Sequence, residues 1–249
     1  MNNETRPLNR GGQRIHKLIQ DDCLSVLKKI PNNSVDLICI DPPYLISRQT
    51  NFDKGGAWNN VNDTRHRKTP PKTDFGEWDK TELDLITLFK EYYRVLKLSG
   101  TIICFYDIWK IQELRNAAES AKFKQLRLCK WEKTNPVPIN SKLNYLTNAT
   151  EYFITAVKGG KPTFHSEYDK GIYNYAICSG AERTSHPTQK PLILIEELIK
   201  KHSNENELVL DCFMGSGTTG VACINTNRSF IGVELNEEYY NIALKRNAI

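Results

Sequence analysis

The stretch LVLDCFMGSGTTGVAC, residues 208–223, joins an apolar run, an acid and a glycine-rich turn. The run predicts a buried strand that ends at Asp211, and a helix begins near Thr218. Gly215 and Gly217 bracket the turn, and glycine is needed where the backbone turns sharply or approaches a ligand. Ligands of open α/β sheets bind beyond the carboxyl ends of the strands. The stretch therefore predicts a ligand site, and the alternative is an ordinary strand–turn–helix.

The next predicted strand, SFIGVEL, supplies a second acid. It ends near Glu234, where a carboxylate is placed to accept hydrogen bonds from ribose hydroxyls. The turn does not match G-x-x-x-x-G-K-[ST], which excludes a triphosphate P-loop. It does not match G-x-G-x-x-G either, so no pyrophosphate cradle is predicted.

A second strand that ends at an acid lies far upstream, in VDLICIDPPYLIS at residues 35–47. The apolar run 35–40 is followed by Asp41, two prolines and Tyr44. The prolines stiffen the turn and have no backbone N–H to donate. The alternative interpretation is a strand-ending turn with an exposed tyrosine.

Strand-like and helix-like segments alternate along the chain. Strands are expected at 16–20, 35–40, 101–106, 127–132, 151–157, 208–213 and 229–235. Helices are expected at 23–30, 82–100, 110–122, 191–203, 217–227 and 236–249. This alternation favours a doubly wound α/β fold with a mainly parallel sheet. Two irregular segments, 45–79 and 136–185, interrupt the pattern.

Composition places the 249-residue chain among soluble globular proteins, since 39% of its residues are hydrophobic and 25% are charged. No apolar run approaches bilayer length, and residues 1–14 lack the apolar core of a secretory signal. We therefore expect a cytoplasmic protein without a membrane segment. Seven cysteines without C-x-x-C spacing indicate reduced core thiols, and no metal site is expected.

Basic residues gather in two segments, although the net charge is only +5. Residues 45–73 contain six Lys or Arg against two acids, and residues 122–142 contain six against one. Local basic surface of this kind suits a polyanion such as nucleic acid. The alternative is a solvated loop and a solvated strand edge.

Five motifs together resemble the β group of amino-DNA methyltransferases. They are DPPY at 41–44, DFGEWDK at 74–80, WEKTNPVP at 131–138, HPTQKP at 186–191 and DCFMGSGTT at 211–219. The resemblance implies a Rossmann-like, circularly permuted, seven-stranded sheet in one domain, 1–249. Within it, 15–135 would form the catalytic part, 136–185 a small irregular target-recognition insert, and 186–249 the cofactor-binding part.

The resemblance also implies a reaction, in which a methyl group passes from S-adenosyl-L-methionine to the N6 amine of a flipped adenine. Asp41 and the Pro42 carbonyl would each accept one N–H of the amine, Pro43 would stiffen the turn, and the Tyr44 ring would stack on the base. This leaves no role for a covalent enzyme intermediate.

Cofactor contacts are implied position by position. The methionine end and the ribose would be surrounded by Asp211, Phe213, Gly215, Gly217 and Thr218, with Asp41 also against the cofactor. Glu234 would bind the ribose hydroxyls, and Asp22, with Asp21 as its rival, would face the cofactor adenine. Thr188 and Lys190 would hold the methionine carboxylate, although Lys190 could also be a solvated residue at a helix start. Family members usually have proline where this chain has Cys212, which bears on cofactor affinity.

The expected partner is double-stranded DNA, with single-stranded DNA as the alternative. The candidate DNA-contacting residues are Arg48, Arg65, Arg67, Lys68, Asn140 and Lys142, and the sequence does not say which read bases. Relatives of this group are often dimers and often act beside a restriction endonuclease, so a homodimer and such a partner are both allowed.

Three other functions compete with adenine methylation. N4-cytosine enzymes more often have Ser in place of Asp41. RNA and protein-glutamine methyltransferases usually have Asn before the two prolines. A catalytically inactive DNA-binding module is disfavoured because Asp41, Tyr44 and the glycine turn are all present. C5-cytosine chemistry needs a Pro-Cys pair, which is absent.

Overall fold

We describe a computed structural model of the chain, covering residues 14–43, 83–136 and 148–248. The first half of the described chain contains β1 (His16–Gln20), α1 (Cys23–Leu27), β2 (Val35–Ile40), α2 (Leu85–Val95), β3 (Leu96–Tyr106), the 3₁₀ helix η3 (Ile108–Lys110) and α3 (Ile111–Ser120). The second half contains β4 (Lys124–Lys133), β5 (Thr150–Val157), β6 (Ile172–Tyr175), the 3₁₀ helix η5 (Gly180–Glu182), α4 (Leu192–His202), β7 (Leu208–Asp211), α5 (Thr218–Asn225), β8 (Ser229–Glu234) and α6 (Glu237–Arg246).

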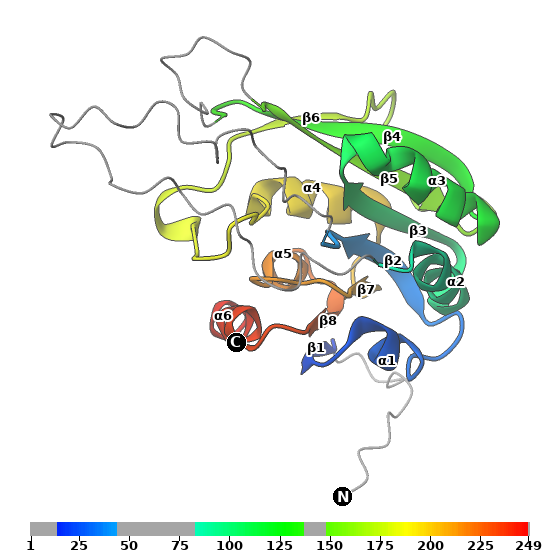
Figure 1. The fold of residues 1–249 in the computed structure, drawn as a ribbon, viewed down its shortest axis with the longest axis horizontal. Helices are drawn as coiled ribbons and strands as arrows, with labels where there is room; N and C mark the ends of the chain where they lie inside the picture. Colours follow the sequence, from blue (N-terminus) through cyan, green and yellow to red (C-terminus); the bar gives the residue numbers. More distant parts are fainter. Residues whose placement is uncertain (1–13, 44–82, 137–147, 249) are drawn as a thin grey trace, which may run out of the picture. The chain divides into compact units, whose positions relative to one another are not determined.

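The strands form one sheet in the order β1-β8-β7-β2-β3-β5-β4-β6. All neighbours pair in parallel except β5, which is antiparallel to both β3 and β4. Helices α4, α5 and α6 cover one face, and α1, α2 and α3 cover the other (Figure 1). This confirms the predicted doubly wound α/β fold with a mainly parallel sheet.

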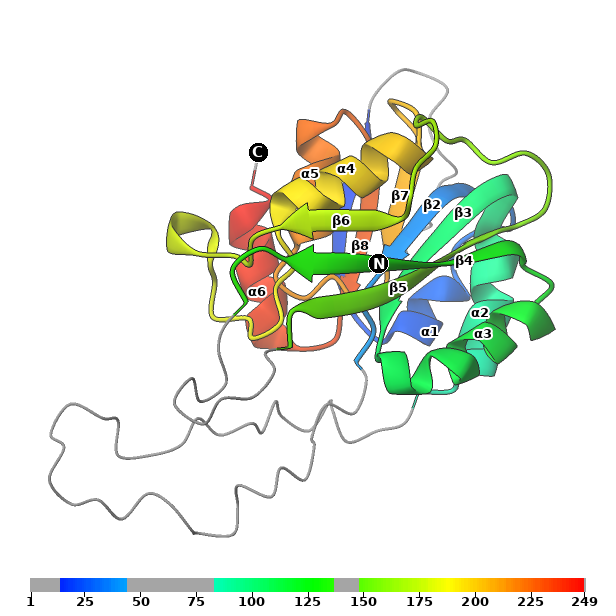
Figure 2. The same cartoon turned by 90° about the horizontal axis from the view of Figure 1, so that it is seen from above.

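The described sheet has eight strands, so the expected seven-stranded sheet is wrong by one. The additional strand, β6, pairs with β4 at the edge of the sheet (Figure 2). It is only four residues long, and only Tyr173 of its side chains is buried. Four residues are too few for an alternating pattern to be recognised in the sequence, and the pairing of β6 depends on β4, which a local pattern cannot reveal. Both β5 and β6 fall within 136–185, so this part of the predicted insert belongs to the sheet.

The predicted helix 82–100 ends earlier than expected. Asp84 caps α2 by accepting a hydrogen bond from the Thr87 backbone N–H at 3.0 Å, and the helix ends at Val95. The following residues 96–100 are the first part of β3, where Leu96 is in register with Val35. These residues therefore form a strand that pairs with β2, although the spacing of their apolar side chains also suits a helix.

Two apolar layers sandwich the sheet. On β2, Leu37 and Cys39 belong to the cluster packed under α4 and α5. Ile38 and Ile40 are equally buried and point to the other face, because side chains alternate along a strand. All seven cysteines are buried and free of disulfides, as the sequence predicts. Among the described residues, no helix is long and apolar enough to cross a membrane.

Arg228 ties together the two connections that lead into β7 and β8. Its side chain is 8% exposed. It donates to the Ser203 carbonyl at 2.7 Å and to the Thr226 carbonyl, and its Nε lies 3.2 Å from the Ser203 hydroxyl. The connection after α4 is thereby held against the turn after α5, which keeps β7 and β8 in place.

We predict that Arg228→Met lowers the free energy of unfolding by about 2–5 kcal/mol, because buried acceptors lose their donors. Urea denaturation measures this change. Arg115→Met is the matched control, since Arg115 forms only an exposed ion pair with Glu119. The control should cost less than about 1 kcal/mol. Equal losses in the two variants would contradict the role of Arg228.

Candidate active site

Three neighbouring parallel strands end in carboxylates at the same edge of the sheet. Glu234 and Asp211 are the last residues of β8 and β7, and Asp41 directly follows β2. In the sheet order β8-β7-β2 these strands are adjacent, so their carboxyl ends meet. Asp41 and Glu234 both act electrostatically on Asp211 and raise its pKa. The edge is therefore rich in carboxyl groups.

Asp211 closes the start of the glycine turn with its own side chain. Its Oδ1 accepts the Phe213 backbone N–H at 3.0 Å, and its Oδ2 accepts the Thr219 hydroxyl at 2.6 Å. Burial raises the pKa of Asp211 to about 7, although these hydrogen bonds oppose the rise. Cys212, in the position where proline is usual, is buried and leaves the turn intact.

Glu234 holds the glycine turn from the neighbouring strand. Its Oε2 accepts the Gly215 backbone N–H at 2.9 Å, and its Oε1 accepts the Asn236 N–H at 2.8 Å. Burial raises the pKa of Glu234, while these backbone donors lower it. Gly215 and Glu234, which are both predicted to bind the cofactor, are thus joined by a hydrogen bond.

The two glycines of the turn meet two different requirements. Both have positive φ, +50° at Gly215 and +78° at Gly217, a region that side chains disfavour. A Cβ on Gly215 would lie 2.7 Å from Nε2 of His186, the first residue of HPTQKP. A Cβ on Gly217 would collide with the Asn247 amide and would lie 2.9 Å from the Ala243 Cβ.

Helix α6 supports the turn from behind, through residues that sequence reasoning missed. Arg246 donates to the Ser216 carbonyl at 2.8 Å and to the Thr218 hydroxyl at 3.0 Å. Asn247 donates to the Gly217 carbonyl at 3.1 Å. These residues look like ordinary polar residues at a helix end, and no motif in the sequence marks them. Thr218 is buried, and its hydroxyl already accepts a hydrogen bond.

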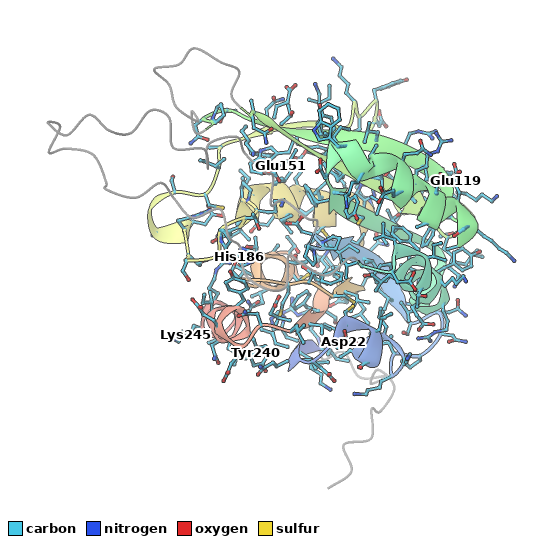
Figure 3. All side chains as sticks on the ribbon, in the orientation of Figure 1. Asp22, Glu119, Glu151, His186, Tyr240 and Lys245 are labelled. Atoms are coloured by element: carbon cyan, nitrogen blue, oxygen red, sulfur yellow. The ribbon has the colours of Figure 1, made fainter. Side chains whose placement is uncertain are left out.

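The HPTQKP segment lies between the glycine turn and Asp41. His186 packs edge-on against the Tyr239 ring, with 4.4 Å between ring centroids. Figure 3 shows His186 near α5, the helix that follows the glycine turn. Burial lowers the pKa of His186 to about 4, so the ring is neutral at pH 7. Thr188 is half-buried. Gln189 accepts from the Thr184 backbone N–H at 2.9 Å and holds the segment in shape.

Lys190 connects this segment to the end of β2. Its side chain is 6% exposed, and its Nζ forms ion pairs with the Asp41 carboxylate and, at 3.1 Å, with Glu151 Oε2. Glu151 lies at the start of β5, within the predicted insert (Figure 3). Lys190 is therefore not a solvated residue, and Glu151 is a site residue that sequence reasoning missed. The other Asp41 oxygen, Oδ1, is buried and has no hydrogen-bond partner among the described residues.

The end of β1 adds the two predicted adenine-facing acids. Asp22 caps α1 by accepting the Ser25 N–H at 2.9 Å. Asp22 is exposed, whereas Asp21 is half-buried and pairs with Lys29 at 3.2 Å. The Asp21 backbone N–H donates to the Glu234 carbonyl at 3.3 Å. Both acids thus lie beside the end of β8, and the choice between them stays a prediction.

Several predicted residues lie outside the described ranges. Pro42 is buried, and Pro43, the last residue of the first described range, is half-buried. The remaining ones are Tyr44, Arg48, Arg65, Arg67, Lys68, Asn140 and Lys142. Their roles stay predictions. Within the described ranges, no three His, Cys, Asp or Glu side chains are arranged to hold a metal ion.

Comparison with known proteins gives consistent matches over almost the full chain. The family model described as DNA methylase, for N6 and N4 methylation, matches residues 35–245. Type II methyltransferase M2.LlaDCHI of Lactococcus lactis subsp. cremoris is 33% identical over 92% of this chain and 88% of its own length. Type II methyltransferase M2.DpnII of Streptococcus pneumoniae has the same identity and coverage.

Solved structures with the same fold include a complex with SAM and a DNA methyltransferase. The crystal structure of the M1.HpyAVI–SAM complex has a TM-score of 0.69 and 29% identity, and covers 94% of this chain and 99% of that one. The cytosine-N4-specific PvuII DNA methyltransferase also has a TM-score of 0.69, over 96% of this chain and 91% of that one. Its identity is 17%, so that likeness is one of fold alone.

We predict that Gly217→Ala destabilises the protein more than Gly180→Ala does. Both glycines have positive φ, but nothing lies within 4 Å of a Cβ on Gly180. The control therefore measures backbone strain alone, about 1–2 kcal/mol, whereas Gly217→Ala adds a collision with Asn247. Urea denaturation of both variants gives the difference, and equal costs would show that packing at Gly217 is unimportant.

We predict that Asp211→Asn gains stability relative to the wild type as the pH rises from 5 to 8. The folded pKa of Asp211 is raised to about 7, so the native state binds more protons than the unfolded state below pH 7. The free energy of unfolding of the wild type should therefore fall as the pH rises through this window. The Asn side chain of Asp211→Asn does not titrate, so the variant should not show this fall. In the control, Asp21→Asn, the wild-type pKa is lowered, chiefly by the Asp22 backbone N–H, so no change is expected over the same window. A constant difference between Asp211→Asn and the wild type would contradict the prediction.

Proposed function

The chain belongs to the N6/N4 DNA methylase family, and we propose that it methylates the N6 amine of a flipped adenine in DNA with S-adenosylmethionine. The observation that carries this proposal is the buried, unpartnered Oδ1 of Asp41. A buried acceptor without a donor costs about 1–3 kcal/mol. Such a group is understandable where a substrate donor completes the hydrogen bond.

The residues at the sheet edge fit this cofactor. Asp211 and Glu234 hold the glycine turn by accepting hydrogen bonds from its backbone N–H groups, which places both carboxylates beside the turn. A carboxylate-rich edge suits a cation, and the bound cofactor supplies an electrophilic methyl group on a positively charged sulfonium. The Asp211 and Glu234 region would hold the methionine end and the ribose, and Asp22 would face the adenine.

The amine of adenine is a poor nucleophile because its lone pair is delocalised into the ring. Asp41 Oδ1 would accept one N–H and the Pro42 carbonyl the other, which favours a tetrahedral nitrogen. The protein thus acts through fixed acceptors and through positioning. Tyr44 would hold the extruded base by stacking.

Adenine is favoured over cytosine by the identity of residue 41. The chain has Asp where N4-cytosine enzymes more often have Ser. A carboxylate is the stronger acceptor for an amine that develops positive charge during attack. N4 methylation of cytosine remains the alternative, since the family model covers both reactions.

Wider aspects of the function are supported by composition and by the relatives. DNA contact is proposed for the basic residues of 45–73 and for 137–147, which lie outside the described ranges. The relatives named above are type II methyltransferases, which supports a role in a cytoplasmic restriction-modification system. A restriction endonuclease partner and a homodimer stay predictions.

We predict that DNA incubated with the protein and S-adenosylmethionine gains N6-methyladenine, detected by mass spectrometry of its nucleosides. Asp41→Ala should lower the rate at least about 100-fold, because the fixed acceptor is lost. Calorimetry should find cofactor binding largely retained in this variant. N4-methylcytosine as the sole product would refute adenine specificity, and full activity of Asp41→Ala would remove Asp41 from its role.

A further inference from the structure

Asp41 is one end of a row of four buried or half-buried charges. Lys133 on β4 pairs with Glu151 Oε1 at 2.8 Å, and the other Glu151 oxygen lies 3.1 Å from Lys190. Lys190 in turn pairs with Asp41. The signs alternate, so the formal charges of the four groups cancel. The row crosses from β4 through β5 to the end of β2.

Lys190 is held rigidly in this row. Its side chain is almost fully buried, and its Nζ lies over the Phe105 ring, 5.1 Å from the centroid. The backbone next to it is fixed as well, since Pro191 precedes α4 directly and Gln189 is bonded to Thr184. A lysine in this position can orient the carboxylate that it contacts.

The two carboxylate oxygens of Asp41 have different surroundings in this row. Oδ2 is bound to Lys190, whereas Oδ1 has no partner among the described residues. Fixing Oδ2 sets the plane of the carboxylate and thereby the direction of Oδ1. An acceptor must be preorganised to favour the transition state, because it then has no reorganisation to undergo during reaction.

The surroundings of Asp41 oppose its ionisation, with one exception. Burial raises its pKa most strongly, and Glu151 raises it further, while Lys190 lowers it. Asp211 on β7 is a further neighbouring acid. The Cys39 and Cys104 thiols also interact with Asp41, and burial keeps both well above their ordinary pKa. The Lys190 ammonium is the cation that lowers the pKa of Asp41. Glu151, the other anion beside Lys190, raises that pKa and so offsets part of the lowering.

We infer that Lys190 and Glu151 are positioning residues for methyl transfer. Lys190 holds the Asp41 carboxylate ionised with one oxygen directed at the substrate amine, and Glu151 holds the Lys190 ammonium from its other side. The inference rests on the proposed function. It reassigns Lys190, which family resemblance places on the methionine carboxylate of the cofactor. It also gives a role to Glu151, which no motif identified.

The test measures the single-turnover methylation rate from pH 5.5 to 9, at saturating cofactor. Lys190→Met should lower the rate about 10- to 100-fold at pH 7.5. It should also shift the acid limb of the profile upward by about one to three pH units, because Asp41 loses its cation. Lys190→Arg should restore the position of the acid limb. Glu151→Gln should shift the limb to lower pH, because an anion near Asp41 is removed.

Lys201→Met is the matched control. Lys201 also lies between two carboxylates, Asp169 at 2.6 Å and Glu197 at 2.5 Å, and over an aromatic ring, that of Tyr173. Its partners are remote from the end of β2, so the pH profile should not move. Thermal unfolding and calorimetric cofactor affinity, measured for every variant, separate misfolding and lost binding from a slower reaction.

Each result decides between the alternatives. If Lys190 binds the methionine carboxylate instead, Lys190→Met weakens cofactor affinity and leaves the saturated rate and the acid limb unchanged, which overturns the inference. The inference is also overturned if the acid limb shifts in the same direction for Lys190→Met and Glu151→Gln. If the acid limb of Glu151→Gln does not move, Glu151 has no positioning role. No methylation by the wild type would refute the proposed function itself, whereas an active wild type with an unaffected Lys190→Met refutes only the positioning role.

Discussion

The parallel pairing of β2 with β7 is the constraint on which the site depends. Leu37 pairs with Val209, and Ile38 with Leu210, in the middle of the sheet. This register brings Asp41 and Asp211 to one edge, although about 170 residues separate them in the chain. The pairing is stabilised by apolar side chains on both faces, packed under α4 and α5 on one side and buried on the other. A change in that register would separate the acceptor from the glycine turn.

Burying several carboxylates at one edge is unfavourable, and two kinds of interaction offset this cost: hydrogen bonds and an ion pair. Asp211 and Glu234 are stabilised by backbone N–H groups and a hydroxyl, which also shape the turn. Asp41 is stabilised by the Lys190 ammonium. Backbone donors suit groups that shape a pocket, whereas an ion pair through one oxygen leaves the other oxygen available for the substrate. Asp211 and Glu234, which are proposed to hold the cofactor, thus differ from Asp41, which is proposed to accept the substrate amine, in the interactions that stabilise them.

Much of the fold followed from local patterns. Apolar runs that lead into acids correctly predicted that strands end at Asp211 and Glu234 and directly before Asp41. The strand β6 and the end of α2 were missed, because both depend on which strand lies alongside. Glu151, Arg246 and Asn247 were missed for a related reason. Their contacts with Lys190 and with the glycine turn span 28 residues or more, and no local spacing records such a separation.

By itself, the sequence determined the kind of chemistry at the sheet edge. An acid followed by two prolines, and a glycine turn after a second acid, are chemical features of single short segments, so they can be recognised without a fold. Only the tertiary structure decided which groups act together. It placed Lys190 on Asp41 and brought Glu151 from β5 to the same ammonium. Electrostatic interactions depend on distance and burial in space, and neither is encoded in the spacing of residues along the chain.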